Sequence, residues 1–368
     1  MSALLQKLRR LTVKLSRSGP TISRPFVFGV VGINHPHIYH QVKVLREAGG
    51  TLQSFFAPED DLAARFQKKY PHASRARAEA EVLEDESISV IASAAIPADR
   101  AAIGLRAMRH GKDVLMDKPG ATTLDQVTEL RRAHQQTGRF YTVLFSERLL
   151  TKSTVRALEL TRSGAIGRVL HTLGTGPHRP ALATRPDWFF NKQRYGGILV
   201  DIAAHQIDQF LTFTNSTEAR IVAAQVGNLN HPEYPELEDF GDLTLHGNGG
   251  LGYIRVDWFT PAGLPVWGDS RLFILGTEGT IEVRKYVDVG GRPGADHLFI
   301  VDAESARYED CSRVELPFPR EYGVDLAQRT QNAISQEHVF RAMELAIRAE
   351  LQATVVTPPQ SGRALEKR

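Results

Sequence analysis

The sequence predicts an α/β unit with a doubly wound parallel sheet, followed by an α+β domain with a large, mostly antiparallel open sheet. Up to about residue 147, short apolar runs alternate with segments of helical spacing, which is typical of a parallel sheet. After residue 219, segments with β patterning dominate, and turns of Gly, Pro and Asn separate them. The length of 368 residues suits two domains.

Continuous apolar, β-branched runs predict the buried parallel strands of the first unit, over residues 25–32, 51–56, 88–94, 113–116 and 140–145. Apolar residues at helical spacing predict helices over residues 38–48, 60–70, 97–110 and 123–137. Stop signals agree with these ends, because Gly49-Gly50, Pro71 and Gly138 each follow a predicted helix.

The second unit begins with a helix over residues 153–162 and a strand over 168–174. A loop rich in Pro, His and Arg then leads to a helix that carries Asp201 and His205. Further strands are predicted over residues 221–226, 241–246, 252–259, 271–275 and 280–284, and a closing helix over 336–353. We therefore expect domains over residues 25–147 and 148–357, a basic, flexible extension over 1–24 and a polar tail over 358–368.

Composition excludes several functional classes. The net charge of +3 gives no general reason to expect a nucleic-acid partner. No run of 18 apolar residues occurs, so no membrane-spanning helix is expected. One cysteine, Cys311, permits no internal disulfide, and we expect a cytoplasmic protein. Arg9-Arg10 lacks the apolar stretch of an export signal, so the basic start is interpreted as a solvated extension, with a transit segment or a subunit-binding arm as alternatives.

Two motifs carry the candidate catalytic residues. Lys118 follows a strand in Met116-Asp-Lys-Pro119, where open α/β sheets bind ligands. Asp201 and His205 lie four residues apart, which on one helix places both side chains on one face. Lysine, imidazole and carboxylate together can position an alcohol, accept its proton and fix the tautomer of the base.

Two neighbours complete the second motif. Gly196-Gly197 precedes the predicted helix and suggests a close approach of backbone to ligand. Asp208 lies one turn further on the same face, where a supporting role is expected. The alternative is that Lys118 is a surface lysine and that Asp201 and His205 form a solvated face or a capped core pair.

The turn after the first strand resembles a weakened dinucleotide-binding turn of the form G-x-G-x-x-G. Gly32 matches one glycine, whereas Asn34 and His37 occupy two others. Asn34 tolerates a left-handed backbone, so the turn can still form. His35 and His37 are two possible metal ligands, but without nearby carboxylate or thiolate in the sequence we interpret them as turn residues and expect no metal.

The end of the second strand is where a Rossmann domain normally distinguishes NAD from NADP. Ala57 stands where an acid normally binds the adenosine ribose. Glu59 and Asp60 can substitute, although both suit the N-terminus of the next helix. The choice between NAD and NADP therefore stays open. The full set of expected cofactor-binding residues is Gly32, Asn34, His35, His37, Ala57, Pro97, Lys118 and Pro119.

Basic and aromatic residues near the second motif suit a polyhydroxylated or anionic ligand, because rings cover sugar faces and charged donors fix hydroxyls or carboxylates. The candidate substrate residues are Arg148, His178, Arg179, Trp188, Arg194 and Tyr195.

Together these motifs resemble the Gfo/Idh/MocA oxidoreductase family, the group of glucose–fructose oxidoreductase and inositol dehydrogenase. The resemblance rests on Asp117-Lys118-Pro119, on the spacing from Gly196 through Asp201 and His205 to Asp208, and on Leu275-Gly276-Thr-Glu-Gly279. It implies a Rossmann domain that binds NAD or NADP, with Lys118 bonded to the reacting hydroxyl, His205 as general acid/base, and Asp201 orienting His205 or the substrate.

The resemblance also implies hydride transfer to or from a sugar, cyclitol or sugar acid, and a homodimer or homotetramer formed through the second-domain sheet. Two alternatives stay open at this point. One is a glycosidase or lyase that oxidises its substrate transiently with a retained nicotinamide, and the other is a non-catalytic ligand sensor.

Overall fold

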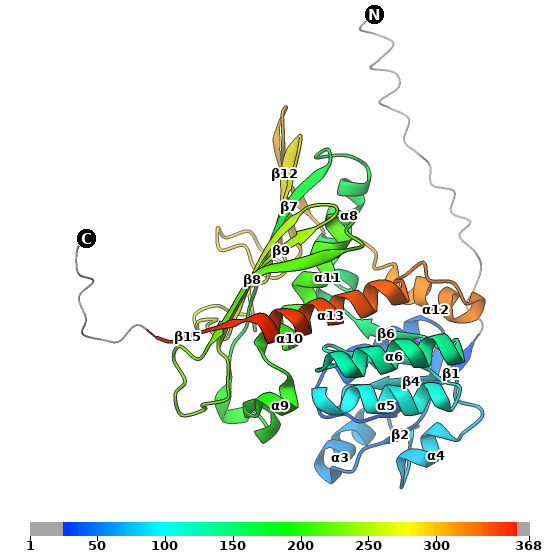
Figure 1. The fold of residues 1–368 in the computed structure, drawn as a ribbon. Coiled ribbons are helices and arrows are strands. Elements are labelled where there is room, and N and C mark those ends of the chain that lie inside the picture. Colours follow the sequence, from blue (N-terminus) through cyan, green and yellow to red (C-terminus); the bar gives the residue numbers. More distant parts are fainter. Residues whose placement is uncertain (1–24, 359–368) are drawn as a thin grey trace, which may run out of the picture.

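The computed structural model describes residues 25–358 (Figure 1). The predicted extension over residues 1–24 and nearly all of the predicted polar tail lie outside the described residues. Both predicted sheets are present, so the expected fold class is confirmed. No helix within residues 25–358 is apolar over a length that would cross a bilayer.

The first sheet has six parallel strands in the order β3-β2-β1-β4-β5-β6. Its strands are β1 (Phe26–Val31), β2 (Gly50–Phe56), β3 (Ser74–Arg75), β4 (Val90–Ser93), β5 (Asp113–Asp117) and β6 (Tyr141–Leu144). The short β3 was not predicted, because two exposed residues carry no apolar pattern.

Helices connect these strands on both faces of the sheet (Figure 1). They are α2 (Ile38–Glu47), α3 (Asp60–Lys69), α4 (Glu79–Leu83), α5 (Pro97–Arg109) and α6 (Leu124–Thr137). Thr123 caps α6 through a reciprocal bond with Gln126, and Gly138 ends it with a left-handed backbone. The carboxyl ends of β1, β4 and β5 meet at one edge, where the chain turns toward the second unit.

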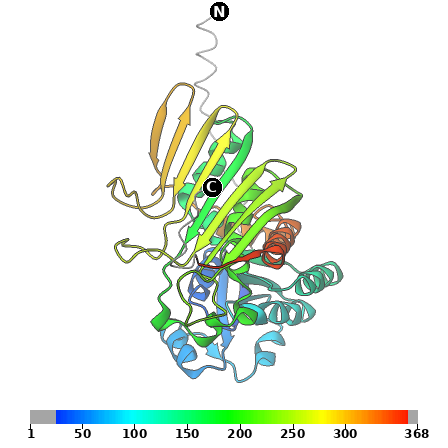
Figure 2. The same ribbon diagram turned by 60° about the vertical axis from the view of Figure 1, so that its left-hand side comes forward.

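The second sheet has nine strands in the order β14-β13-β12-β11-β7-β10-β9-β8-β15, mostly antiparallel (Figure 2). The strands are β7 (Val169–Pro177), β8 (Ala219–Gly227), β9 (Phe240–Gly247), β10 (Leu251–Asp257), β11 (Arg271–Gly276), β12 (Gly279–Arg284), β13 (His297–Asp302), β14 (Ala306–Asp310) and β15 (Thr354–Val356). Two neighbouring pairs, β7 with β10 and β8 with β15, are parallel.

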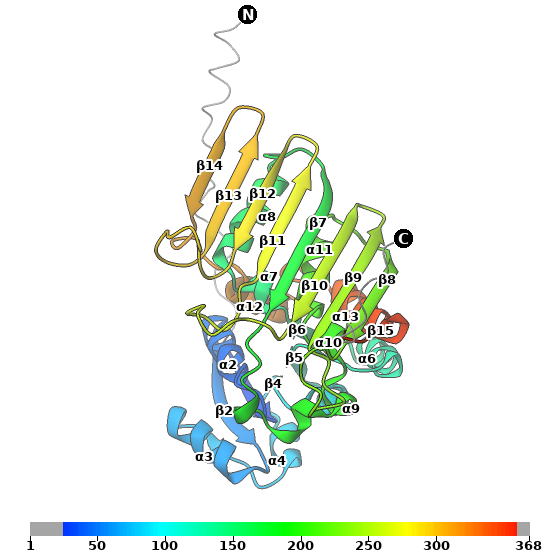
Figure 3. The ribbon, with the colours of Figure 1, turned by 90° about the vertical axis from the view of Figure 1, so that its left-hand side faces the viewer.

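The helices of the second unit are α7 (Ser146–Leu149), α8 (Lys152–Arg162), α9 (Lys192–Tyr195), α10 (Ile198–Asp201), α11 (Ala204–Phe213), α12 (Phe318–Gln328) and α13 (Gln336–Gln352), with short 3-10 turns η1 (Leu182–Thr184) and η2 (Asp187–Phe190). In Figure 3 the sheet faces the viewer, α8, α11 and α13 lie behind it, and no helix covers its near face. α13 packs on β8 and α11 and also on α6 and β6, which joins the two units.

The open face carries apolar side chains. In β11 the buried and exposed positions alternate, and Phe273 and Leu275 on the open face are 38% and 45% exposed. Leu251 and Val301 are similarly exposed. A face of this kind on an extended sheet is typical of an interaction surface.

Candidate active site

Lys118 leaves the carboxyl end of β5 and reaches the start of the second unit. Its Nζ donates to the main-chain O of Asp201 at 2.9 Å and to Oδ1 of the same residue at 3.0 Å. The Lys118–Pro119 peptide bond is cis. Arg100, from α5, is buried and bonds the main-chain O of Lys118, that of Pro119 at 3.1 Å and Oδ2 of Asp117 at 2.9 Å. No sequence pattern pointed to Arg100, which holds the backbone beneath the lysine.

The prediction that one helix carries Asp201 and His205 is wrong, because the helix is interrupted between them. α10 ends at Asp201 and α11 begins at Ala204. In a continuous helix the carbonyl of Asp201 would accept from the N–H of His205. Here the ammonium of Lys118 takes that carbonyl, and the N–H of His205 donates to Ile202 O at 3.1 Å instead.

His205 is 3% exposed, and its Nδ1 has no hydrogen-bond partner within residues 25–358. Burial holds the pKa of His205 well below its usual value, and the charges of Lys118 and Lys285 lower this pKa further. The imidazole is therefore neutral near pH 7 and can accept a proton. His37 and His178 contribute to the same lowering, so the charges of four groups act on His205, and we call His205 with these four groups the catalytic cluster.

Lys285 lies just after β12 and belongs to this catalytic cluster, although no sequence pattern indicated it. Its ammonium pairs with Glu147 from α7. Burial alone would lower the pKa of Lys285, but Glu147 raises it to about 12. Lys285 carried no local pattern that points to a site, because it reaches these groups only through the fold of the second sheet.

The glycine turn after β1 fits a dinucleotide. Gly32 has a φ of +78°, and a Cβ there would lie 2.6 Å from Cβ of Ala95, so only glycine is tolerated. Nδ2 of Asn34 donates to Oε1 of Glu59 at 2.7 Å. Pro97 begins α5 beside this edge.

The end of β2 revises the interpretation of its acids. Ala57 is buried and has no polar side-chain atom to offer. Glu59 stands at the N-terminus of α3 but makes no capping bond there. Its Oε2 is buried and has no partner within the described residues. A buried carboxylate oxygen of this kind, tied to the glycine turn, suits the hydroxyls of an adenosine ribose.

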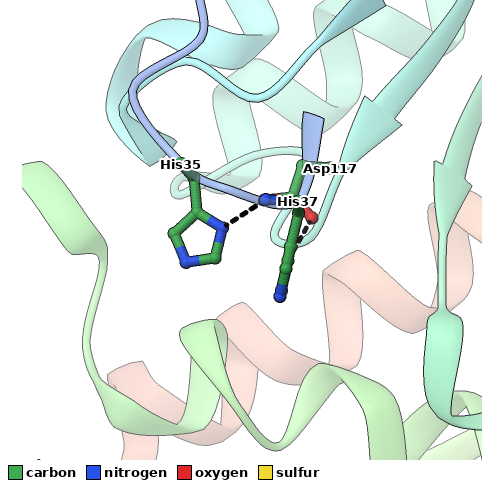
Figure 4. Close-up of side chains that lie close together, drawn as sticks. All are labelled: His35, His37 and Asp117. Carbon is green, nitrogen blue, oxygen red and sulfur yellow. Dashed lines mark hydrogen bonds and ion pairs between the residues drawn. The ribbon is translucent and has the colours of Figure 1, made fainter. Parts of the chain in front are cut away.

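His35, His37 and Asp117 form a cluster that could hold a metal ion (Figure 4). The carboxylate is already used on both oxygens: Oδ1 lies 2.9 Å from Nδ1 of His37, and Oδ2 lies 2.9 Å from the Arg100 guanidinium. Nδ1 of His35 accepts the backbone N–H of His37 at 3.3 Å. Since a cation occupies the carboxylate and a backbone donor occupies the imidazole, the cluster fits a hydrogen-bonded turn better than a metal site.

The two glycines before Asp201 serve a different purpose from the predicted approach to a ligand. A Cβ on Gly197 would lie 2.2 Å from Cδ of Glu350, and one on Gly196 would lie 2.8 Å from Cγ2 of Thr122. Glu350, from α13, accepts the N–H of Leu199 at 3.2 Å. The missing side chain on Gly197 therefore lets a buried carboxylate reach the N-terminus of α10.

Several predicted substrate residues have structural partners instead. Arg148 forms a bidentate pair with the fully buried Asp208, at 2.7 and 2.8 Å. His338 also bonds Asp208, at 2.7 Å, so the supporting role expected for Asp208 is toward α7 and α13 and not toward His205. These contacts remove Arg148 from the substrate residues that we propose.

The predicted substrate residues in the loop before α10 also have partners within the protein. Tyr195 is buried, and its hydroxyl lies 3.0 Å from both Glu236 O and Glu238 N. Arg194 pairs with Asp99 near the surface. The remaining loop residues are held as follows: Arg179 binds the carbonyls of Pro261 and Leu264, Trp188 packs edge-on against Phe189, and His178 packs against Trp258. Among them, His178 has a pKa that burial lowers to about 4 and that the charge of Lys118 helps to lower.

The fold and the cluster around Lys118, Asp201 and His205 define a class of protein, a two-domain oxidoreductase with a Rossmann domain. Residues 26–145 match the family described as "Oxidoreductase family, NAD-binding Rossmann fold", and residues 154–282 match the "GFO/IDH/MocA C-terminal domain". The chain belongs to the Gfo/Idh/MocA family. A cofactor of the NAD or NADP type, expected from the sequence, is thereby confirmed.

Individual relatives agree with the family. A crystal structure of a protein from Erwinia carotovora atroseptica, designated an oxidoreductase, is 45% identical with a TM-score of 0.88, and the match covers 90% of this chain and 99% of that chain. The D-xylose dehydrogenase of Paenarthrobacter nicotinovorans is 28% identical, over 46% of this chain and only 47% of that protein. The scyllo-inositol 2-dehydrogenase (NAD(+)) of Bacillus subtilis is 23% identical, over 67% of this chain and 68% of that protein.

Proposed function

We propose that this chain is a nicotinamide-dependent dehydrogenase that oxidises a hydroxyl of a sugar, cyclitol or sugar acid, or reduces the matching ketone. The carrying observation is that the ammonium of Lys118 contacts Asp201 and also acts electrostatically on a neutral His205, whose Nδ1 has no partner within the described residues. The names of the xylose and inositol dehydrogenases support the substrate class.

The residues fit a nicotinamide dinucleotide. Gly32 permits the left-handed turn that packs against Ala95, and α2 begins just after this turn, so its N-terminus would face the pyrophosphate. The open Oε2 of Glu59 would bind the ribose. When bound, the cofactor supplies the hydride acceptor or donor.

The proton chemistry belongs to the chain. Lys118 donates hydrogen bonds, so it would hold the oxygen of the reacting hydroxyl and stabilise negative charge there. His205, neutral and without a partner at Nδ1, would take the hydroxyl proton during oxidation and return it during reduction. Asp201 would orient Lys118 and the substrate.

The direct test is a pair of fluorescence titrations with NADH and NADPH, after a check of the denatured protein for carried-over nicotinamide, followed by a polyol screen. Saturable binding of one form and NADH production from a free sugar would support the proposal. A retained cofactor that never exchanges, with cleavage of glycosides, would favour transient oxidation. A His205→Asn variant with unchanged activity would contradict the enzymatic role.

Assembly and organisation are part of this proposal. The open sheet face with Leu251, Phe273, Leu275 and Val301 is the surface through which we expect a homodimer or homotetramer. Leu275→Asp should reduce the mass measured by light scattering if that face is the interface. A domain boundary near residue 147 is supported by the family matches on either side of it. The single cysteine, Cys311, supports action in the cytoplasm.

A further inference from the structure

The second unit contains a half-buried cation that has no acid partner within residues 25–358. Arg185 follows η1, and its guanidinium lies over three aromatic rings, 4.1 Å from the centroid of Phe189, 4.8 Å from Trp258 and 5.0 Å from Trp267. Its Nε donates to Pro180 O at 2.8 Å. Within residues 25–358, neither terminal nitrogen has a hydrogen-bond or ion-pair partner, and Nη2 is buried.

The other three cations near the catalytic groups each have a carboxylate partner. Lys118 is paired with Asp201, Lys285 with Glu147, and Arg100 with Asp117. Burial depresses the pKa of Arg185 to about 10, and within the described residues the charge that offsets this is Asp201, which Lys118 already holds. Arg185 stays protonated at neutral pH, so of these four cations it alone lacks a carboxylate partner in the described part of the chain. A half-buried cation without a partner costs free energy that a bound anion would recover.

The position of Arg185 links it to the reacting groups. Trp258 packs against Arg185 and also against His178, at 5.6 Å between ring centroids. His178 in turn interacts electrostatically with Lys118 and Lys285. Backbone hydrogen bonds hold the segments around Arg185 together. The N–H of Arg179 donates to Trp267 O and that of His178 donates to Asp257 O, both at 2.8 Å. The indole of Trp258 therefore contacts both Arg185 and the imidazole of His178, and this imidazole interacts with Lys118 and Lys285.

We propose that Arg185 is a specificity-determining residue that binds an anionic group of the substrate, remote from the carbon that reacts. This inference rests on the proposed function and narrows it to polyhydroxylated acids, because a guanidinium binds a carboxylate or phosphate through two parallel hydrogen bonds. The aromatic rings around Arg185 and the neighbouring His178 would cover the sugar ring between the two ends.

The test measures ligand binding to the enzyme–NADH complex by calorimetry, with sugars that differ in one group. D-glucose is compared with D-glucuronate and with glucose 6-phosphate, and D-galactose with D-galacturonate. At least one anion should bind about tenfold or more tightly than its neutral counterpart, and the carboxylate and phosphate arms identify the source of the charge. Equal affinities for every pair, or no binding of any anion, would overturn the proposal.

Variants separate a specific contact from a general effect. Arg185→Gln should remove the preference for the anion and leave the affinity for the neutral sugar within about twofold. Arg220→Gln is the control, because it removes the same charge from an exposed position on β8. A preference that survives Arg185→Gln would contradict the assignment.

Two further measurements distinguish a loss of anion binding from a loss of folding or of cofactor binding. Arg185→Lys retains the charge without the planar fork, so it should keep part of the preference if Arg185→Gln fails to fold. NADH binding by each variant reports on the proposed function separately. A protein that binds NADH or NADPH but shows no anion preference contradicts this inference alone, whereas one that binds neither cofactor contradicts the proposed function.

Discussion

The ammonium of Lys118 binds both the main-chain carbonyl and the carboxylate of Asp201, at 2.9 and 3.0 Å. Lys118 belongs to the first sheet and Asp201 to the second unit, so this contact crosses the junction. α10 ends at this contact, and the carbonyl that Lys118 binds is the one that would accept the N–H of His205 in a continuous helix. The contact therefore joins the two units at the point where the helix between two candidate catalytic side chains is interrupted.

Removing Lys118 should stop catalysis without removing the cofactor. Lys118→Ala is expected to lower kcat by about a hundredfold or more, because the reacting oxygen loses its cationic donor. NADH affinity should change little. Lys43→Ala, at an exposed position in α2, is the control. An equal loss of kcat in both variants, or normal turnover in Lys118→Ala, would refute the role.

The pH dependence of the oxidation should follow His205. Since burial and nearby lysines hold its pKa well below the usual value of about 6.5, kcat/KM should stay level as pH falls to that value and decline only below it. Replacing the pair Lys285–Glu147 by Met and Gln removes one of these cations, so the decline should begin at higher pH. A profile that does not move would show that another group titrates.

Cofactor preference should depend on Glu59. Its buried, unpartnered Oε2 near the glycine turn would bind ribose hydroxyls and repel a 2′-phosphate. We expect NADH to bind about tenfold or more tightly than NADPH, and Glu59→Gln to narrow this ratio. Asp60→Asn, which alters an exposed acid paired with Arg75, should leave the ratio unchanged. A protein that prefers NADPH would overturn this assignment.

Arg148 should matter for stability and not for substrate affinity. Arg148→Met leaves the carboxylate of Asp208 buried with only His338, which should cost about 3–5 kcal/mol of unfolding free energy. The KM of the folded fraction should be unchanged. Urea unfolding and steady-state kinetics decide between the two roles, and a raised KM in a stable variant would restore the substrate interpretation.

Glu350 should make stability depend on pH. Burial and Glu238 raise its pKa to about 7, against the effect of Lys192. The native state thus favours the protonated acid, so the contribution is complete below the usual pKa of 4.5 and is lost as pH rises through about 7.

Glu350→Gln mimics the protonated form. Relative to the wild type it should gain stability at about pH 8, by at most about 3 kcal/mol, and gain little at about pH 5. Urea unfolding at both pH values measures this. Glu337→Gln, at an exposed position on the same helix, should show no such difference. An equal effect of Glu350→Gln at both pH values would contradict the raised pKa.

Local patterns were sufficient for most of the fold. The apolar runs that form β1, β4, β5 and β6 need no distant information, because strands buried on both faces are apolar throughout. The edge strand β3 and the strands β13 to β15 were missed. β3 and β15 have only two and three residues, and β14 has no buried position.

The sequence by itself determined the two-domain fold, the strand-exit lysine and the motif around Asp201 and His205, because spacing along the chain encodes the strand period, the helix period and the turns. Only the tertiary structure decided the partners of the charged groups. Arg148 is taken by Asp208, Gly197 makes room for Glu350, and Lys285 enters the site from the far sheet. Electrostatic interactions and close contacts depend on distance in space, and residues separated by 60 to 153 positions meet only after both sheets have formed.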